Sequence, residues 1–233
     1  MLRGPALDRP ADVQWAREGC MPRVVEKVTI FVTRHSNSGH DLLLFEHPSA
    51  GIQIPAGTVE AGEKPETAAR RETAEETGLD DFTAQRYLGS IDEMLPETRR
   101  IIGENTKVYA RPDPSSFDWA QLRRGLVVHL ERQVPGFAHV TYEEWDQVAD
   151  PRYISFQITG WVPQQALAEI RRRHFFHFEH HGATPERWVV KTDNHYFTLF
   201  WVPLQALPAI VEPQTTWLSW LDLPYRLPLI KRA

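Results

Sequence analysis

Residues 57–79 constrain the fold of this chain more than any other stretch, because they specify a loop followed by a helix. They read G-T-V-E-A-G-E-K-P-E-T-A-A-R-R-E-T-A-E-E-T-G-L. Pro65 tolerates the first helical position, and the acidic side chain of Glu66 suits the positive end of the helix. Gly78 can end the helix, since it adopts the left-handed conformation without a Cβ penalty. The sequence therefore predicts a helix that begins at Pro65 and ends one residue before Gly78.

Three acidic side chains fall on one side of this helix. At 100° per residue, Glu72, Glu75 and Glu76 lie within about a third of its circumference, and like charges at such spacings repel one another. An exposed, charge-laced helix is the ordinary explanation of such a run. A hard divalent cation would turn the repulsion into binding, because Mg²⁺ and Mn²⁺ prefer carboxylate oxygens. The strand-like residues 52–55 and the loop with Glu63 lead into the helix and favour the metal-binding interpretation.

The whole segment resembles a Nudix box, whose pattern is G-x5-E-x7-R-E-U-x-E-E-x-G-U with U an aliphatic residue. The specified positions are met by Gly57, Glu63, Arg71, Glu72, Glu75, Glu76, Gly78 and Leu79. The departure is Thr73, which stands where an aliphatic residue is usual. The resemblance implies a Nudix hydrolase with an α/β fold, an α/β/α sandwich around a mixed β-sheet. It also implies a metal-dependent pyrophosphohydrolase that cleaves the diphosphate of a nucleoside diphosphate linked to another moiety.

The resemblance further implies roles for individual residues. The ligands of Mg²⁺ or Mn²⁺ would be the carboxylates of Glu72, Glu75 and Glu76 and the backbone carbonyl of Ala56. Glu75 would bind a further ion or orient water. Glu63 and Arg71 would form the pair that fastens the loop to the helix. The general base stays open between Glu72, Glu75 and an acid outside the box, such as Glu179 or Glu186.

The substrate is less constrained than the reaction. A nucleotide derivative is implied, with ADP-ribose, an NDP-sugar and a nucleoside triphosphate all remaining candidates. Tryptophan side chains could stack on a base, although core packing explains each of them as well; they are Trp119, Trp145, Trp161 and Trp188. The alternative function is a nucleotide-binding sensor on a Nudix scaffold without turnover. The intact acids of the box argue against that alternative.

Composition limits the compartment and the partners. Cys20 is the sole cysteine, which excludes an internal disulfide bond and suits a reducing compartment. The first ten residues lack the apolar core of a secretory signal, and no apolar run is long enough to span a membrane. The net charge of −5 argues against broad binding to nucleic acid. We therefore expect a cytoplasmic protein with a small-molecule substrate and without membrane or nucleic-acid partners.

The domain organisation is predicted as an irregular lead-in over residues 1–21 and a single domain over residues 22–233. Residues 98–173 are expected to be an insertion, which carries 11 Lys and Arg against 9 Asp and Glu. Within this insertion, residues 118–124 are expected to form a short helix. Glu143, Glu144 and Asp146 are expected to form a solvated turn.

One heptapeptide occurs nearly twice, as W-V-P-Q-Q-A-L from Trp161 and as W-V-P-L-Q-A-L from Trp201. Each copy follows a strand-like run, and each proline could start a helix. Closure of the domain by the second copy would make residues 98–173 an insertion, and closure by the first would make residues 174–233 an extension. We favour the second copy.

Histidines and tryptophans leave two further alternatives open. Half of the ten histidines lie in one stretch and are His174, His177, His180, His181 and His195. Their spacing matches no common structural zinc site, so a contact of one of them with substrate or phosphate is the stronger expectation. In the C-terminal tail, Trp217, Trp220 and Tyr225 either pack in the core or form an exposed patch for a homodimer contact.

Overall fold

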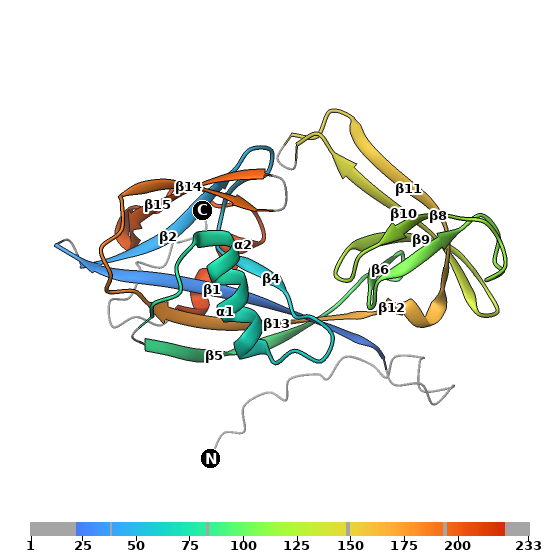
Figure 1. Ribbon diagram of the computed structural model, residues 1–233, viewed down its shortest axis with the longest axis horizontal. Helices are drawn as coiled ribbons and strands as arrows, with labels where there is room; N and C mark the ends of the chain where they lie inside the picture. The colour runs from blue at the N-terminus through green and yellow to red at the C-terminus, as the bar shows by residue number, and fades with distance from the viewer. Residues whose placement is uncertain (1–21, 38, 83, 148–149, 193–194, 222–233) are drawn as a thin grey trace, which may run out of the picture.

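A computed structural model describes residues 22–37, 39–82, 84–147, 150–192 and 195–221. The protein has two lobes, each built on its own β-sheet (Figure 1). The predicted lead-in over residues 1–21, including Cys20, lies outside the described residues, as does Tyr225. None of the described helices has the length and apolar character that crossing a bilayer requires.

The first sheet has eight strands among the described residues, and its main path runs in the order β14-β15-β2-β1-β13-β5. These strands are β14 (Arg187–Thr192), β15 (His195–Pro203), β2 (Gly39–His47), β1 (Val24–Ser36), β13 (Ile170–Glu179) and β5 (Ala84–Met94). Two short strands complete the sheet, β3 (Gly51–Gln53) beside β2 and β4 (Ala56–Thr58) beside β1. Because β1 runs parallel to β13 and antiparallel to β2 and β4, the sheet is mixed.

Both faces of the first sheet are covered. On one face, Ile30 and Val32 of β1 belong to a core that includes Ala68 and Ala69 of α1 (Pro65–Thr77). On the other face, Phe31 belongs to a second core, which is covered by η3 (Leu204–Ala206), α2 (Gln214–Trp217) and η4 (Leu218–Trp220). Alternate residues of β1 thus serve opposite layers, which confirms the predicted α/β sandwich with a mixed sheet.

The helix α1 has the predicted bounds. Pro65 occupies its first turn, and Gly78 ends it with a φ of 74° and an N–H that donates to the carbonyl of Ala74 at 2.9 Å. Lys64, at the N-cap, makes no side-chain capping bond. Thr73 is fully buried, and its hydroxyl donates to the carbonyl of Ala69 at 2.7 Å. This internal bond explains how a threonine replaces the usual aliphatic residue there without leaving a buried polar group unpaired.

The second sheet has seven strands among the described residues, in the order β12-β6-β9-β10-β11-β7-β8. They are β12 (Leu167–Ala168), β6 (Arg99–Ile102), β9 (Val127–Val134), β10 (Phe137–Trp145), β11 (Ile154–Pro163), β7 (Thr106–Tyr109) and β8 (Asp118–Leu122). Two predictions are wrong here. The expected short helix over residues 118–124 is instead the strand β8 and the turn after it. Of the three acids expected in a turn, Glu143 and Glu144 lie inside β10, and Asp146 alone lies in a bend, directly after that strand. Pairing of β8 with β7, and of β10 with β9 and β11, overrides the local sequence preference.

The chain leaves the first sheet at the end of β5 and returns to it at the start of β13. Met94 pairs with Ile170, and the N–H of Leu95 donates to the carbonyl of Glu169 at 2.9 Å. The predicted insertion over residues 98–173 therefore needs a correction at its end, because residues 170–173 belong to β13 of the first sheet. We propose a single domain over residues 22–233 in which residues 99–168, the second sheet, are the inserted part.

The two copies of the heptapeptide lie in different sheets. Trp161 belongs to β11 of the second sheet, whereas Trp201 belongs to β15 of the first sheet and pairs with Leu43 of β2. This strand pairing agrees with the preference for the second copy. Within each copy, the residues after the proline form a single turn of 3-10 helix, η2 (Gln164–Ala166) or η3, where the proline suggested the start of a helix.

The described part of the tryptophan-rich tail packs on the body of the protein. The ring of Trp220 stacks on Phe175 with centroids 4.6 Å apart, and the guanidinium of Arg173 lies 4.0 Å from the Trp217 ring centroid. Core packing therefore accounts for these two tryptophans, and the homodimer stays a prediction.

Candidate functional site

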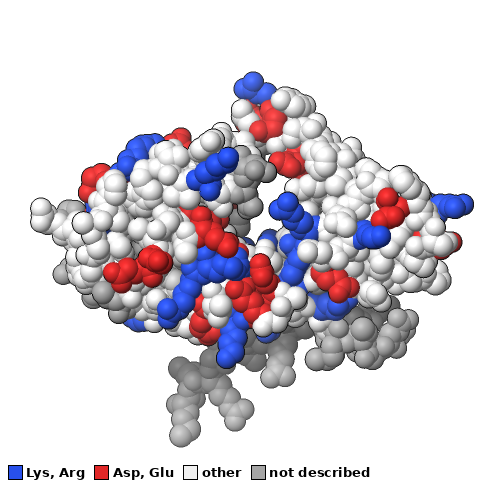
Figure 2. Space-filling model, in the orientation of Figure 1, with Lys and Arg blue, Asp and Glu red and all other residues white. Residues whose placement is uncertain are grey.

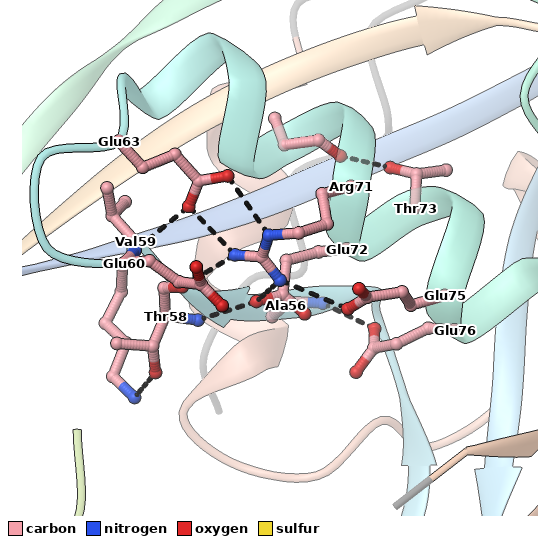
Figure 3. A network of polar contacts seen from close by, with 12 residues as sticks. Ala56, Thr58, Val59, Glu60, Glu63, Arg71, Glu72, Thr73, Glu75 and Glu76 are labelled. Carbon is pink, nitrogen blue, oxygen red and sulfur yellow. Dashed lines mark hydrogen bonds and ion pairs between the residues drawn. The ribbon is translucent and has the colours of Figure 1, made fainter. Parts of the chain in front are cut away.

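The acidic side of α1 faces the short strand β4. A carboxylate oxygen of Glu72 accepts the N–H of Thr58 at 3.1 Å, and Glu76 accepts the N–H of Ala56 at 3.0 Å (Figure 3). Because β4 pairs with β1, these bonds hold the helix acids against the edge of the first sheet. The site is thus positioned by regular secondary structure on both sides.

Gly57, between those two residues, allows the close approach of Glu72. A Cβ atom at position 57 would lie 1.8 Å from the carboxyl carbon of Glu72 and 2.1 Å from one of its oxygens. Its φ lies outside the left-handed region, so the glycine serves here for space rather than for backbone freedom. This contact explains why a glycine opens the motif.

Arg71 ties the loop to the helix with every N–H of its guanidinium. Its Nε and Nη2 donate to the two carboxylate oxygens of Glu63 at 3.0 and 2.9 Å, and Nη2 also donates to the carbonyl of Thr58 at 3.1 Å. Its Nη1 donates to Glu72 at 2.9 Å and to Glu75 at 3.1 Å (Figure 3). A guanidinium has five N–H groups in a fixed fork, and all of them find oxygen acceptors here.

The carboxyl groups of this network differ in their pKa values. The hydrogen bonds from Arg71 lower the pKa of Glu63 below its ordinary value. Burial raises the pKa of Glu72 above its ordinary value, although Arg71 acts in the opposite direction. A buried carboxylate whose negative charge is poorly solvated is stabilised by a cation at its free oxygen.

A cleft of about 700 Å³ separates α1 and β4 from the second sheet. Its first wall comes from the first lobe and consists of Lys27, Ala56, Gly57, Thr58, Glu60, Ala61, Arg71, Glu72 and Glu76. Its second wall comes from the second lobe and consists of Glu104, Asn105, Arg123 and Arg124. In Figure 2, acidic and basic side chains gather on the visible face where the two lobes meet. The size of the cleft suits a small-molecule ligand.

Arg124 joins the two walls. Its Nε donates to the carbonyl of Val59 at 3.0 Å, and its Nη1 donates to the carbonyl of Gly103. Its own backbone N–H donates to the side-chain oxygen of Asn105 at 2.8 Å. Arg123, the neighbouring residue, is exposed at the cleft. The pair thus combines one arginine fixed in the junction with one that is accessible to a ligand.

Lys27 is a member of the site that the sequence reasoning missed. Its Nζ donates to the hydroxyl of Thr58 at 2.5 Å. Burial, and next the nearby charge of Arg173, lower the pKa of Lys27 to about 8. The available signal was a lysine inside the apolar run of β1, since a charged residue in a buried strand needs a partner or a function.

The structure brings together most of the predicted site residues. Those that line the cleft are Ala56, Arg71, Glu72 and Glu76. Glu75 is half-exposed and bonds to Arg71. The outside acids lie elsewhere, since Glu179 contacts His35 and His181, and Glu186 contacts Arg34. None of the four tryptophans considered for base stacking lines the cleft, whose described lining contains no aromatic residue.

The residues at the cleft fit a hard divalent cation. Glu72 and Glu76 supply carboxylate oxygens, and Ala56 supplies backbone beside them. Oxygen-only donors of this kind suit Mg²⁺ or Mn²⁺ and do not suit softer metals. The close approach of Glu72 to β4, which Gly57 allows, and the raised pKa of Glu72 agree with such an ion.

A comparison with family models points to the same segment. Residues 25–119 match the model of the NUDIX domain. A solved structure, a MutT/nudix family protein from Enterococcus faecalis, is 16% identical, and the match covers 62% of this chain with a TM-score of 0.28. The chain spans 55% of that protein's length. A comparison with curated proteins found no match. On the strength of the family match and of the box residues assembled around α1, the chain contains a NUDIX domain.

Proposed function

We propose that the protein is a metal-dependent pyrophosphohydrolase that cleaves the diphosphate of a nucleotide derivative. One observation carries the proposal. Glu72 and Glu76 converge beside β4 in a cleft whose opposite wall presents Arg123. Carboxylates on one side and a guanidinium on the other are what a diphosphate with its metal ions requires.

Mg²⁺ or Mn²⁺, when bound, neutralises charge on the phosphate oxygens and lowers the pKa of a water molecule. The protein's own residues position the reaction. Glu72 and Glu76 would hold the ion, with the carbonyl of Ala56. Arg71 fixes the carboxylates of Glu63, Glu72 and Glu75, so that the ligands are oriented before substrate arrives.

The general base is best sought inside the box. Among the described residues, Glu179 and Glu186 contact side chains outside the box and share no partner with the acids of the cleft, which disfavours both. Glu75 is half-exposed and oriented by Arg71, so we propose it as the base or as the ligand of a further ion. Glu72 is the second candidate.

The positive charges of the cleft support a phosphate-containing substrate. Arg123 and Lys27 can contact phosphate oxygens from opposite walls. A volume of about 700 Å³ accommodates ADP-ribose, an NDP-sugar or a nucleoside triphosphate. The cytoplasm is the proposed compartment, because the single cysteine suits a reducing environment.

The test is a panel of candidate substrates assayed with Mg²⁺ and with Mn²⁺, with products resolved by chromatography. The panel holds ADP-ribose, NDP-sugars, dinucleoside polyphosphates, NAD and nucleoside triphosphates. Glu76→Gln removes one proposed ligand and is expected to abolish turnover while the protein stays folded. Glu66→Gln is the matched control, because Glu66 is an exposed acid in the first turn of the same helix.

Metal-dependent cleavage of one compound, lost in Glu76→Gln and retained in Glu66→Gln, would support the proposal. Full activity in Glu76→Gln would show that the site is assigned to the wrong residues. Nucleotide binding without any product would favour the sensor alternative.

A further inference from the structure

A second cluster of metal-binding side chains lies far from the cleft, at the other end of β1. His35 of β1 pairs with His40 of β2 across their hairpin, and Glu179 ends β13 beside Thr33. His35, His40 and Glu179 each offer a ligand atom, and these atoms lie within 4.8 Å of one another. Lys27, at the cleft, is eight residues from His35 along β1, or about 26 Å at about 3.3 Å per residue. The cluster is therefore distinct from the acids of α1.

Two contacts to Glu179 have lengths close to the spacing between ligand atoms around a single ion. Nε2 of His35 lies 3.0 Å from Oε1 of Glu179, and Nε2 of His181 lies 3.2 Å from the same oxygen. The rings of His35 and His40 have centroids 4.2 Å apart. Donor atoms bound at about 2.0–2.1 Å to one tetrahedral zinc ion are about 3.3 Å apart. The ligand atoms of His35, His40 and Glu179 lie within 4.8 Å of one another, and His181 adds a fourth candidate ligand through its contact with Glu179.

The residues that precede the cluster on its strands hold it in place. Alternate residues of a strand share a face, so Thr33 precedes His35 and His177 precedes Glu179 on the same side of the sheet. Nε2 of His177 lies 2.7 Å from the hydroxyl of Thr33, and its Nδ1 lies 3.1 Å from a nitrogen of Arg86. Both ring nitrogens of His177 thus contact neighbouring side chains on the same face of the sheet as the cluster. His35, His40 and Glu179 themselves lie on strands that pair with one another.

We propose that His35, His40, Glu179 and His181 form a site for a borderline divalent transition-metal ion, for which Zn²⁺ is the probe. Imidazole suits zinc, copper and nickel, whereas Mg²⁺ and Ca²⁺ take oxygen ligands. The site joins β1, β2 and the end of β13 and acts as a structural clamp across these three neighbouring strands of the first sheet. Of the histidines in the stretch 174–195, the site uses His181 alone, together with Glu179.

Without a metal, the same contacts would be hydrogen bonds from two histidines to Glu179. Calorimetric titration of the tag-free, EDTA-treated protein with Zn²⁺ in excess Mg²⁺ distinguishes the two cases. Loss of a residue that only supports a metal ligand typically weakens metal binding by about 10- to 100-fold. Substitution of a ligand itself should therefore weaken Zn²⁺ binding by at least that factor. The test variants are His35→Ala and Glu179→Gln, and Co²⁺ absorption in the visible range reports ligand geometry independently.

Two controls separate this site from others. His195 is an exposed histidine outside the proposed site, and its ring centroid lies 4.9 Å from that of His47. His195→Ala therefore removes one member of another histidine pair and should leave Zn²⁺ binding unchanged. Glu76→Gln disables the proposed catalytic ion site and should likewise leave it unchanged. Zn²⁺ binding that is lost in His35→Ala and Glu179→Gln, with native circular dichroism, supports the proposal. Failure of the parent protein to bind Zn²⁺, or equal binding by all variants, overturns it.

Discussion

Gly57→Ala offers a sharp test of the proposed catalytic site, because it acts through a single contact. The new methyl group would lie 1.8 Å from the carboxyl carbon of Glu72. To restore even a 3.0 Å contact, the carboxylate must retreat by about 1.2 Å. That movement breaks its bonds to the N–H of Thr58 and to Arg71, which are 3.1 and 2.9 Å long.

The variant should lose activity more than stability. A displacement of about 1 Å at a catalytic group costs about 100-fold in rate, equivalent to about 2.7 kcal/mol. Each lost bond to the carboxylate is worth about 1.5–3 kcal/mol, but the carboxylate regains hydration in the cleft. Replacing glycine also returns about 0.4–1 kcal/mol by restricting the unfolded chain. We therefore expect the free energy of unfolding to fall by only about 1–2 kcal/mol.

Gly62→Ala is the matched control in the same loop. Gly62 has a φ of 79°, and a Cβ there would meet no atom within 4 Å. An alanine in that conformation costs about 1–2 kcal/mol of stability without displacing any ligand. Urea unfolding, Mn²⁺ titration by electron paramagnetic resonance, and kcat/KM on the best substrate of the panel together compare the two variants. Unchanged Mn²⁺ affinity and kcat/KM in Gly57→Ala would refute the assigned role of Glu72.

Two further predictions concern the charged neighbours of this site. Arg71→Lys keeps the charge but supplies three donors for five acceptor contacts, so urea unfolding should show a loss of about 2–3 kcal/mol at pH 7. Arg71 holds the pKa of Glu63 below its ordinary 4.5. The stability difference between Arg71→Lys and the parent protein should therefore shrink as the pH falls through the lowered pKa of Glu63. A stability difference that does not change with pH would contradict the pairing of Arg71 with Glu63. Lys27 has a pKa of about 8 in the folded protein against an ordinary 10.5. Between these two pH values the unfolded chain therefore binds more protons than the folded protein. The free energy of unfolding should rise with pH in that range, by up to about 3 kcal/mol. Lys27→Met, measured in EDTA, should lack this rise, and equal slopes for both proteins would contradict the burial of a titrating Lys27.

The sequence was most informative where the structure is local. The helix over residues 65–77 was predicted with correct bounds because proline, glycine and the spacing of its acids act within a few residues. The pairing of Glu63 with Arg71 was expected from the family resemblance, and the structure shows it. Roles in catalysis stay predictions.

Sheet pairing accounts for what the sequence could not supply. The residues of β8 have no strong strand pattern, and their conformation follows from β7, which they contact. The cluster of His35 with Glu179 joins residues 144 positions apart, which no motif spacing connects. The buried Lys27 likewise depends on Thr58 and Arg173, which only the folded sheet brings near.

The adjacent exit and return points of the second sheet also bear on how the protein folds. Pairing of Met94 with Ile170 closes a loop of about 75 residues, which for a flexible chain costs about 4 kcal/mol of entropy. Once the second sheet has formed, pairing of β12 with β6 holds the two ends of the inserted segment together. Most of the entropy of closing the loop has then been lost before β5 pairs with β13. Leu122→Ala, in the buried core of the second sheet, should therefore slow refolding of the first sheet in stopped-flow experiments, and an unchanged rate would exclude this order. If refolding is slowed as expected, the second sheet acts as a folding nucleus that fixes the pairing register of β5 with β13.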